Sequence, residues 1–335
     1  MNKKIGKQTV KFENPPRIEC AYSSVGKKEG DGPFGNYFDS IFTDPLMGKD
    51  TWEQAESELL KETVKLLMKK SKNIFGDIDY ILAGDLLNQC TSSSFGIKDF
   101  NIPFLGLFGA CSTFGEGMSV GSMLLDGGFA KKVICAASSH FCSTEKQFRF
   151  PIEYGSARTP TSQWTVTGSG AIILSYEGDG PKITHITTGK IVDLGVTDAN
   201  NMGAAMAPAA ADTIYTHFKE TGRSSDYYDL IVTGDLAKVG MKLNIELLQS
   251  KGIDITQNYN DCGNMVFDQK NQSTKAGGSG CGCAASMFCA YFYSKLKEGE
   301  YKKILFVPTG ALLSPTTAFQ GETIPSIAHA VAIEM

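Results

Sequence analysis

The chain of 335 residues contains no run of hydrophobic residues as long as the roughly 18 that a membrane-spanning helix requires. It also lacks an excess of basic residues, because 32 Lys and Arg stand against 36 Asp and Glu, for a net charge of −4. We therefore expect neither a transmembrane segment nor a nucleic-acid partner held by bulk positive charge. The lysine-rich N-terminus lacks an apolar stretch, so we expect no secretory signal.

Cysteines with metal-binding spacing are also missing. The nine cysteines are an odd number, and most lie in apolar stretches such as the one around Cys135, which indicates buried free thiols in a reducing compartment. Cys281 and Cys283 have no second pair of Cys or His residues to complete a four-ligand zinc site. We predict no metal and no cofactor. A hydrophobic fraction of 42% is enough for a large folded core.

The sequence contains an internal repeat. Residues 79–88 and 229–238 are each a short apolar run that stops at Gly-Asp, as a buried strand does where it enters a turn. Cys111 and Cys281 each lie at the start of a stretch of small residues, which is followed by a pair of lysines and another apolar run. These echoes indicate a duplicated chain.

The predicted helices and strands fit two equivalent halves. Thr51 and Gln54 form a capping box before one helix, and the counterpart of that helix runs over residues 202–219. Strands are predicted from apolar runs at residues 79–84, 132–137, 171–175, 229–233 and 304–308. Strands that alternate with helices favour an α/β fold. We predict two pseudo-symmetric halves, residues 1–180 and 181–335, packed as αβαβα layers.

Cys111 stands where an apolar strand runs into a glycine-rich helix that ends near residues 126–128. At a helix N-terminus the free N–H groups and the helix dipole stabilise a thiolate, and the same place suits a bound anion. The alternative is an inert, small core residue, as free cysteines commonly are.

Residues 141–168 show no clean period and are rich in aromatic and basic residues, so we expect a long excursion over a site. The aromatic residues of this segment include Phe141, Phe148, Phe150, Tyr154 and Trp164, and its cations are Lys146, Arg149 and Arg158.

The duplicated halves, the Ala-Cys-Ser junction at 110–112 and the strand at 167–174 resemble the thiolase superfamily, with the layout of 3-ketoacyl-ACP synthase III. The resemblance implies that Cys111 is the acyl-accepting position, assisted by a His and an Asn in the second half. Gly234 stands at the position of that His and Cys281 at that of the Asn. Glycine cannot move a proton, and cysteine is a poor oxyanion donor. We therefore predict no catalytic residues; the alternative is an active Cys111-dependent acyl-transfer enzyme.

Residues 149–168, with the pattern Arg-Phe-Pro-x-x-Tyr-Gly-x-x-Arg-x-Pro-x-x-x-Trp-Thr-Val-Thr-Gly, are similar to a family of sporulation proteins from spore-forming Firmicutes that have this fold without its activity. The resemblance implies a peripheral protein on the cytoplasmic side of the forespore or spore inner membrane. It also implies binding of dipicolinic acid, alone or with calcium, for uptake into the developing spore and release at germination. The implied partners are membrane channel subunits, and a homodimer is left open.

Dipicolinate is a flat pyridine ring with two carboxylates, so its site needs aromatic or apolar walls, cations and N–H donors. The planar fork of arginine matches a carboxylate in bidentate fashion. The predicted ligand-binding residues are Cys111, His140, Lys146, Arg149, Arg158, Trp164 and Asp85. For the aromatic residues and cations of the excursion, the alternative is that they only pack this segment onto the body. For His140 it is a satisfied core residue, and for Asp85 it is a helix cap.

Overall fold

A twelve-stranded sheet runs through the computed structural model, which describes residues 3–149 and 158–335. Its main path has the order β11-β10-β13-β16-β9-β2-β8-β6-β4-β5, while β1 pairs with β9 and β3 with β2. The strands are β1 (Thr9–Lys11), β2 (Arg17–Gly26), β3 (Ser40–Phe42), β4 (Tyr80–Gly84), β5 (Phe104–Gly106), β6 (Lys132–Ser139), β8 (Gly168–Ser175), β9 (Lys182–Thr187), β10 (Leu230–Thr233), β11 (Tyr259–Asp261), β13 (Lys303–Val307) and β16 (Ala330–Glu334).

The strand order repeats on the two sides of the β2–β9 pair. On one side β5, β4 and β6 are parallel neighbours, followed by β8 and β2 in antiparallel steps. On the other side β11, β10 and β13 are parallel neighbours, followed by β16 and β9 in antiparallel steps. The two sets meet where Arg17 pairs with Lys182. Strand order therefore repeats as the sequence does, while the boundary at residue 180 stays a prediction.

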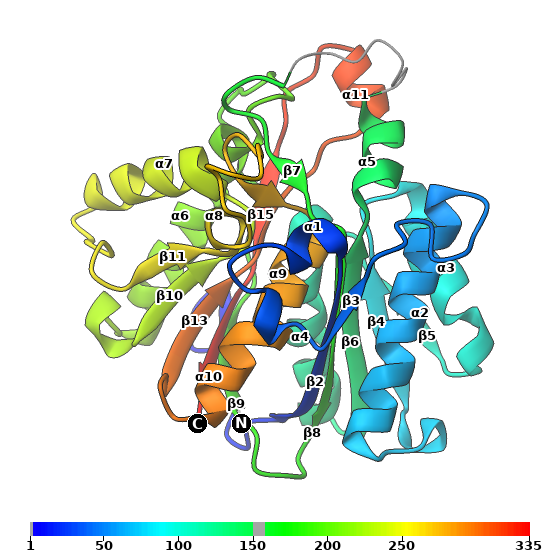
Figure 1. Ribbon diagram of the computed structural model, residues 1–335. Coiled ribbons are helices and arrows are strands. Elements are labelled where there is room, and N and C mark those ends of the chain that lie inside the picture. The colour runs from blue at the N-terminus through cyan, green and yellow to red at the C-terminus, as the bar shows by residue number, and fades with distance from the viewer. Residues whose placement is uncertain (1–2, 150–157) are drawn as a thin grey trace.

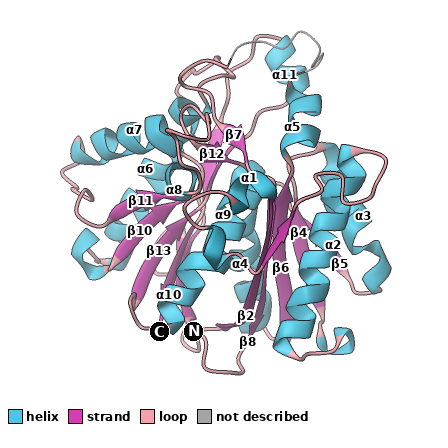
Figure 2. Ribbon diagram, in the orientation of Figure 1, coloured by secondary structure: helices cyan, strands magenta, loops and turns pink. Residues whose placement is uncertain are grey.

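Helices form three layers around these strands. In Figure 1, α4 and α9 lie at the centre, α2 and α3 cover the outer face of the first set of strands, and α6 and α7 cover that of the second. Figure 2 shows the same alternation of helices and strands. The helices are α1 (Lys27–Gly30), α2 (Trp52–Ser71), α3 (Thr91–Ile97), α4 (Thr113–Asp126), α5 (Phe141–Phe148), α6 (Met202–Thr221), α7 (Ala237–Gln249), α8 (Cys262–Met265), α9 (Cys281–Met287), α10 (Tyr293–Lys297) and α11 (Pro315–Phe319). The αβαβα layering predicted from the sequence is confirmed.

Two small sheets complete the fold, one of β7 (Trp164–Thr165) with β12 (Gly278–Ser279) and one of β14 (Thr309–Ala311) with β15 (Ser326–Ala328). The strands predicted from apolar runs are confirmed as β4, β6, β8, β10 and β13.

The ends of the long outer helices follow the local signals of the sequence. The Thr51 hydroxyl accepts a hydrogen bond from the Gln54 N–H at 3.3 Å, as an N-cap does at the start of α2. Helix α6 ends at Gly222, whose φ of +70° lies in the left-handed region that glycine adopts without strain.

The prediction of an irregular excursion over residues 141–168 is wrong for its first part, which forms α5. The helix begins after His140, whose Nδ1 accepts a hydrogen bond from the Cys142 N–H at 3.1 Å. With only eight residues, α5 is too short to show a helical period in the sequence. Phe150 and Tyr154 lie outside the described residues.

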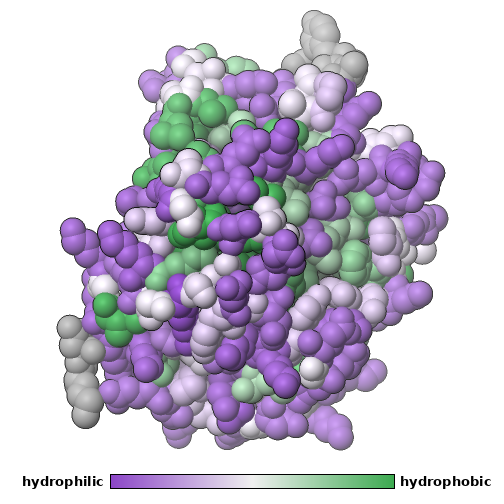
Figure 3. Space-filling model, turned by 90° about the vertical axis from the view of Figure 1, so that its left-hand side faces the viewer, coloured by the Kyte–Doolittle hydropathy of each residue, from purple (hydrophilic) through white to green (hydrophobic). Residues whose placement is uncertain are grey.

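No helix among the described residues combines the length and hydrophobicity needed to cross a membrane. The face of the molecule in Figure 3 is mostly hydrophilic, with hydrophobic areas scattered between.

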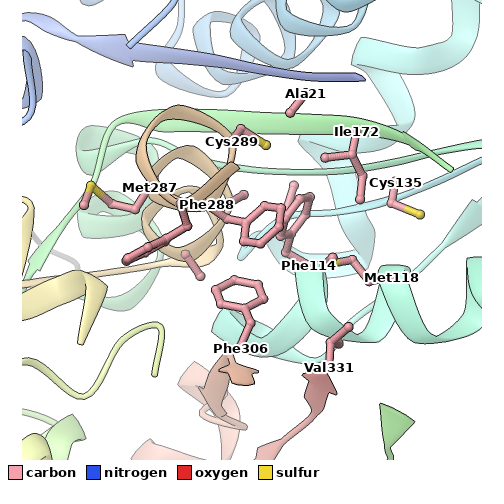
Figure 4. Packing of buried hydrophobic residues seen from close by; sticks show 14 of the residues in the cluster. Ala21, Phe114, Met118, Cys135, Ile172, Met287, Phe288, Cys289, Phe306 and Val331 are labelled. Atoms are coloured by element: carbon pink, nitrogen blue, oxygen red, sulfur yellow. The ribbon is translucent and has the colours of Figure 1, made fainter. Parts of the chain in front are cut away.

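The core between the two central helices is built on three phenylalanines. Phe114 of α4, Phe288 next to α9 and Phe306 of β13 are fully buried. Their ring centroids lie 6.0, 6.3 and 4.8 Å apart in pairs, and Figure 4 shows the rings facing one another. These aromatic contacts join the central helices to the strands of the second set.

We predict that Phe114→Ala lowers the free energy of unfolding by about 3–5 kcal/mol, because it leaves a cavity that the neighbouring rings cannot move to fill. The measurement is urea unfolding followed by far-UV circular dichroism. Phe319→Ala is the matched control, since Phe319 is 83% exposed, and it should change stability by less than about 0.5 kcal/mol. Equal losses in the two variants would contradict this account of the core.

Candidate functional site

A cavity of about 810 Å³ opens between α5, the turn before α4, the start of α6 and β14. The part of its lining on and near α5 carries the aromatic and charged side chains, and the opposite part is apolar. Cys111, Arg149, Arg158 and Trp164, four of the residues predicted from the sequence, line this cavity. Other residues of the lining are Phe141, Cys142, Thr144, Glu145, Gln163, Asn200, Met202, Met206, Ala311 and Leu313.

One wall of the cavity is a pair of stacked aromatic rings under a cation. Phe141 and Trp164 stack with centroids 3.9 Å apart and planes at 10°. The Arg158 guanidinium carbon lies 5.1 Å from the Phe141 ring centroid and 4.8 Å from that of Trp164. Lys28 Nζ, from α1, lies 4.4 Å from the Trp164 centroid. Such cation–π contacts fix the ring and the guanidinium against each other.

Glu145 holds the two arginines of the cavity. Its Oε1 lies 2.7 Å from Arg158 Nη2, and its Oε2 lies 3.4 Å from Arg149 Nε. Arg158 Nη1 also donates to the Gln163 carbonyl at 2.9 Å. Among the charged side chains that residues 3–149 and 158–335 bring to the lining, two arginines therefore face one carboxylate, which leaves one positive charge in excess.

Cys111 lies on a strained turn at the inner end of the cavity. Residues Ala110–Ser112 form a 3-10 turn that leads into α4, and Ala110 has a φ of +48° in the left-handed region, which costs energy for a residue with a Cβ. The thiol is 8% exposed. Burial, with the nearby Asp235 carboxyl as a second cause, raises the pKa of Cys111 well above its usual value. The expectation of a stabilised thiolate is therefore wrong, because desolvation outweighs the backbone N–H groups.

The two positions at which the sequence analysis predicts a departure from thiolase-type enzymes, Gly234 and Cys281, are closed by packing. A Cβ placed on Gly234 would lie 2.8 Å from the Ala284 Cβ, so position 234 has no room for any side chain. Cys281 is fully buried, and its Sγ donates to the Ala110 carbonyl at 2.9 Å. Cys281 thus braces the turn that carries Cys111 and does not line the cavity.

Asp235 is a buried carboxyl group behind Cys111. It is fully buried, and neither of its carboxyl oxygens has a hydrogen-bond partner among the described residues. Burial, and then the neighbouring Asp261 carboxylate, raise the pKa of Asp235 well above its usual value. Burial at this position therefore favours the neutral form of the Asp235 carboxyl group.

The structure does not bring His140 to the cavity. Its Nε2 is 2.9 Å from the Pro45 carbonyl, and its ring stacks on Trp52 at 5.6 Å. With Nδ1 accepting from Cys142, both ring nitrogens are used inside the protein, and burial lowers the pKa of His140. All four histidines of the chain are described, and none of them lines the cavity.

Lys146 and Asp85 also lie outside the lining. Lys146 Nζ forms an ion pair with Glu53 at 2.6 Å on the outer side of α5. The Asp85 carboxylate accepts hydrogen bonds from the Leu87 N–H, the Ser93 N–H and the Ser93 hydroxyl at 2.6–2.8 Å. Asp85 is therefore a structural group that organises the start of α3, which was its alternative interpretation.

Two groups of the lining were missed in the sequence. Glu145 lies four residues before Arg149, a spacing that predicts an ion pair only where a helix is expected. Thr144 is 8% exposed, and its hydroxyl has no hydrogen-bond partner in residues 3–149 and 158–335. Thr144 thus belongs to the lining, but its hydroxyl oxygen is buried and is not exposed to the cavity. Over the same residues, no group of three or more His, Cys, Asp or Glu is placed to hold a metal ion.

The fold defines a thiolase-like protein. Among solved structures, 3-oxoacyl-[acyl-carrier-protein] synthase III from Aquifex aeolicus is similar with 12% identity and a TM-score of 0.57, over 96% of this chain and 100% of that one. Cerulenin-bound OleA from Xanthomonas campestris is similar with 14% identity and a TM-score of 0.59, over 97% and 98% of the two chains.

Sequence comparison is more specific than the fold. The profile of the family Stage V sporulation protein AD matches residues 6–334. Stage V sporulation protein AD of Bacillus subtilis (strain 168) is 45% identical over 332 residues, 99% of this chain and 98% of that protein. The chain belongs to the stage V sporulation protein AD family, and both resemblances seen in the sequence are confirmed.

We predict that iodoacetamide modifies Cys111 much more slowly at pH 8 than it modifies a small free thiol. Alkylation needs the thiolate, and a pKa raised above the usual value leaves less thiolate at pH 8, so the rate should rise as the pH increases further. Peptide mass spectrometry resolves each cysteine, and the same reaction in urea is the control. Labelling of folded protein at Cys111 as fast as in urea would contradict the assigned burial.

Proposed function

We propose that this chain binds dipicolinic acid in the cavity above Cys111 and carries out no acyl transfer. The observation that carries the proposal is the wall of stacked Phe141 and Trp164 under Arg158, with Arg149 beside it. A flat pyridine ring packs on apolar and aromatic walls, and arginine binds a carboxylate through two parallel hydrogen bonds.

The second part of the proposal, the absence of catalysis, is supported by the inner end of the cavity. Gly234 has no space for a proton-transferring side chain, and the Cys281 thiol is already bonded to the Ala110 carbonyl. A raised pKa makes Cys111 a poor nucleophile near pH 7. Loss of a single oxyanion donor typically costs about 10²–10³ in rate, so a site without either group is better suited to binding than to reaction.

The cellular role that we propose is dipicolinate uptake into the developing spore and its release at germination. Membership of a sporulation family supports the setting. The proposal places the chain on the cytoplasmic side of the forespore or spore inner membrane, where it works with membrane channel subunits. The ligand is dipicolinate alone or its calcium chelate, so both forms belong in the binding experiment.

We predict that isothermal titration calorimetry detects dipicolinate binding in the micromolar-to-millimolar range. Arg149→Ala and Arg158→Ala should each weaken it by about 1–3 kcal/mol, because a ligand carboxylate loses its partner. Cys111→Ala should weaken it only slightly. Lys146→Ala is the control, since this lysine pairs with Glu53 outside the cavity, and it should bind as the wild type does. Folded wild-type protein that gives no heat with dipicolinate or its calcium chelate would end the proposal.

We also predict that incubation with acetyl-CoA gives no turnover and no stable acyl group on Cys111. The reason is that the pKa of the thiol is raised, and that Gly234 and Cys281 offer neither a base nor a free oxyanion donor. Intact-protein mass spectrometry followed by peptide mapping measures the adduct, with Cys111→Ala as the control. An adduct that forms on Cys111 and turns over would restore the alternative of an acyl-transfer enzyme.

A further inference from the structure

We propose that Glu145 is a built-in competitor for the ligand: its carboxylate pairs with the two arginines of the cavity, and the second carboxylate of a dicarboxylate ligand must displace it. This inference rests on the proposed function, because it assigns how the same cavity selects among carboxylic acids.

The first support is the position of the Glu145 carboxylate. It is 15% exposed, belongs to the cavity lining and lies between the two arginines, 2.7 Å from Arg158 Nη2 and 3.4 Å from Arg149 Nε. A carboxylate from a ligand would seek the same two guanidinium groups. Glu145 therefore stands where a ligand carboxylate would bind.

The second support is the unequal restraint of the two arginines. Arg158 is fixed by the aromatic pair, by the Gln163 carbonyl and by Glu145. Arg149 contacts Glu145 through Nε, and its two terminal nitrogens have no hydrogen-bond partner among the described residues. The fork of Arg149 is thus less restrained by the described residues than that of Arg158, and we assign it to the first ligand carboxylate. A second one needs Arg158, which is already paired.

The charge of the lining leads to the same conclusion. Among the described lining residues, two arginines and one glutamate leave a single positive charge in excess, which matches one carboxylate. With these three groups the site is one positive charge short of balancing a dicarboxylate, so Glu145 opposes dianions more than monoanions. Removal of its charge should therefore change affinity in a way that depends on the number of carboxylates in the ligand.

The test compares Glu145→Gln with the wild type in titrations with dipicolinate and with pyridine-2-carboxylate, its one-carboxylate analogue. Glutamine keeps the length and one oxygen acceptor, so the arginines retain a neutral partner. We expect E145Q to bind dipicolinate about tenfold more tightly or better, because a like charge within a few ångströms of the ligand is removed. The affinity for pyridine-2-carboxylate should change far less.

Glu53→Gln is the matched control. It also removes a carboxylate from an ion pair with α5, but Glu53 pairs with Lys146 away from the cavity, so both affinities should stay as in the wild type. Glu145→Asp, with a shorter carboxylate, is the second variant if E145Q has a lowered melting temperature. It should tighten dipicolinate binding to a smaller extent.

The outcomes separate this inference from the proposed function. If the wild type binds dipicolinate and E145Q binds it equally or more weakly, Glu145 is not a competitor, and the proposed function is unaffected. An equal gain for both ligands also overturns the inference, because a general loosening of the site would act on both. If neither the wild type nor E145Q binds dipicolinate, the proposed function fails, and the inference fails with it.

Discussion

The structure depends on a contact between α9 and β8 in which the two backbones touch with no side chain between them. A Cβ on Gly170 would lie 2.3 Å from the Ala285 carbonyl oxygen, and one on Gly282 would lie 2.1 Å from the Gly168 carbonyl oxygen. No other residue type fits at either place. This approach lets a helix of the second half lie directly on a strand of the first, which brings the start of α9 to the turn that carries Cys111.

That turn is clamped from two sides. The Cys281 thiol donates to the Ala110 carbonyl at 2.9 Å from one side, and the backbone of β14 approaches from the other, where a Cβ on Gly310 would lie 2.1 Å from the Gly109 carbonyl oxygen. Close packing holds the strained φ of Ala110 and shields Cys111 from water. The packing that positions the thiol therefore also raises the pKa of Cys111, since it keeps water away from the sulfur.

The order of the helices and strands was predictable because short, repeated sequence patterns mark where they begin and end. Gly-Asp ends two equivalent strands, and Thr51 caps α2 as its spacing predicts. The short α5 was not predictable, since two helical turns contain too few apolar positions to show a period. At the candidate site, the clustering of aromatic and cationic residues in one segment was enough to place Arg149, Arg158 and Trp164 at the cavity, while their role in ligand binding stays a prediction.

Residue type was not enough where the direction of a side chain decides its role. Glu145 and Lys146 are neighbours on α5, yet Glu145 pairs with the two arginines inside the cavity while Lys146 pairs with Glu53 outside it. Once a helix is known, adjacent positions point about 100° apart, so the inner and outer charges are separated by geometry and not by composition. The balance of charge in the cavity is therefore a property of α5 as a helix. An irregular segment with the same sequence could direct Lys146 inward and Glu145 to water, and would make a site with three cations and no internal competitor.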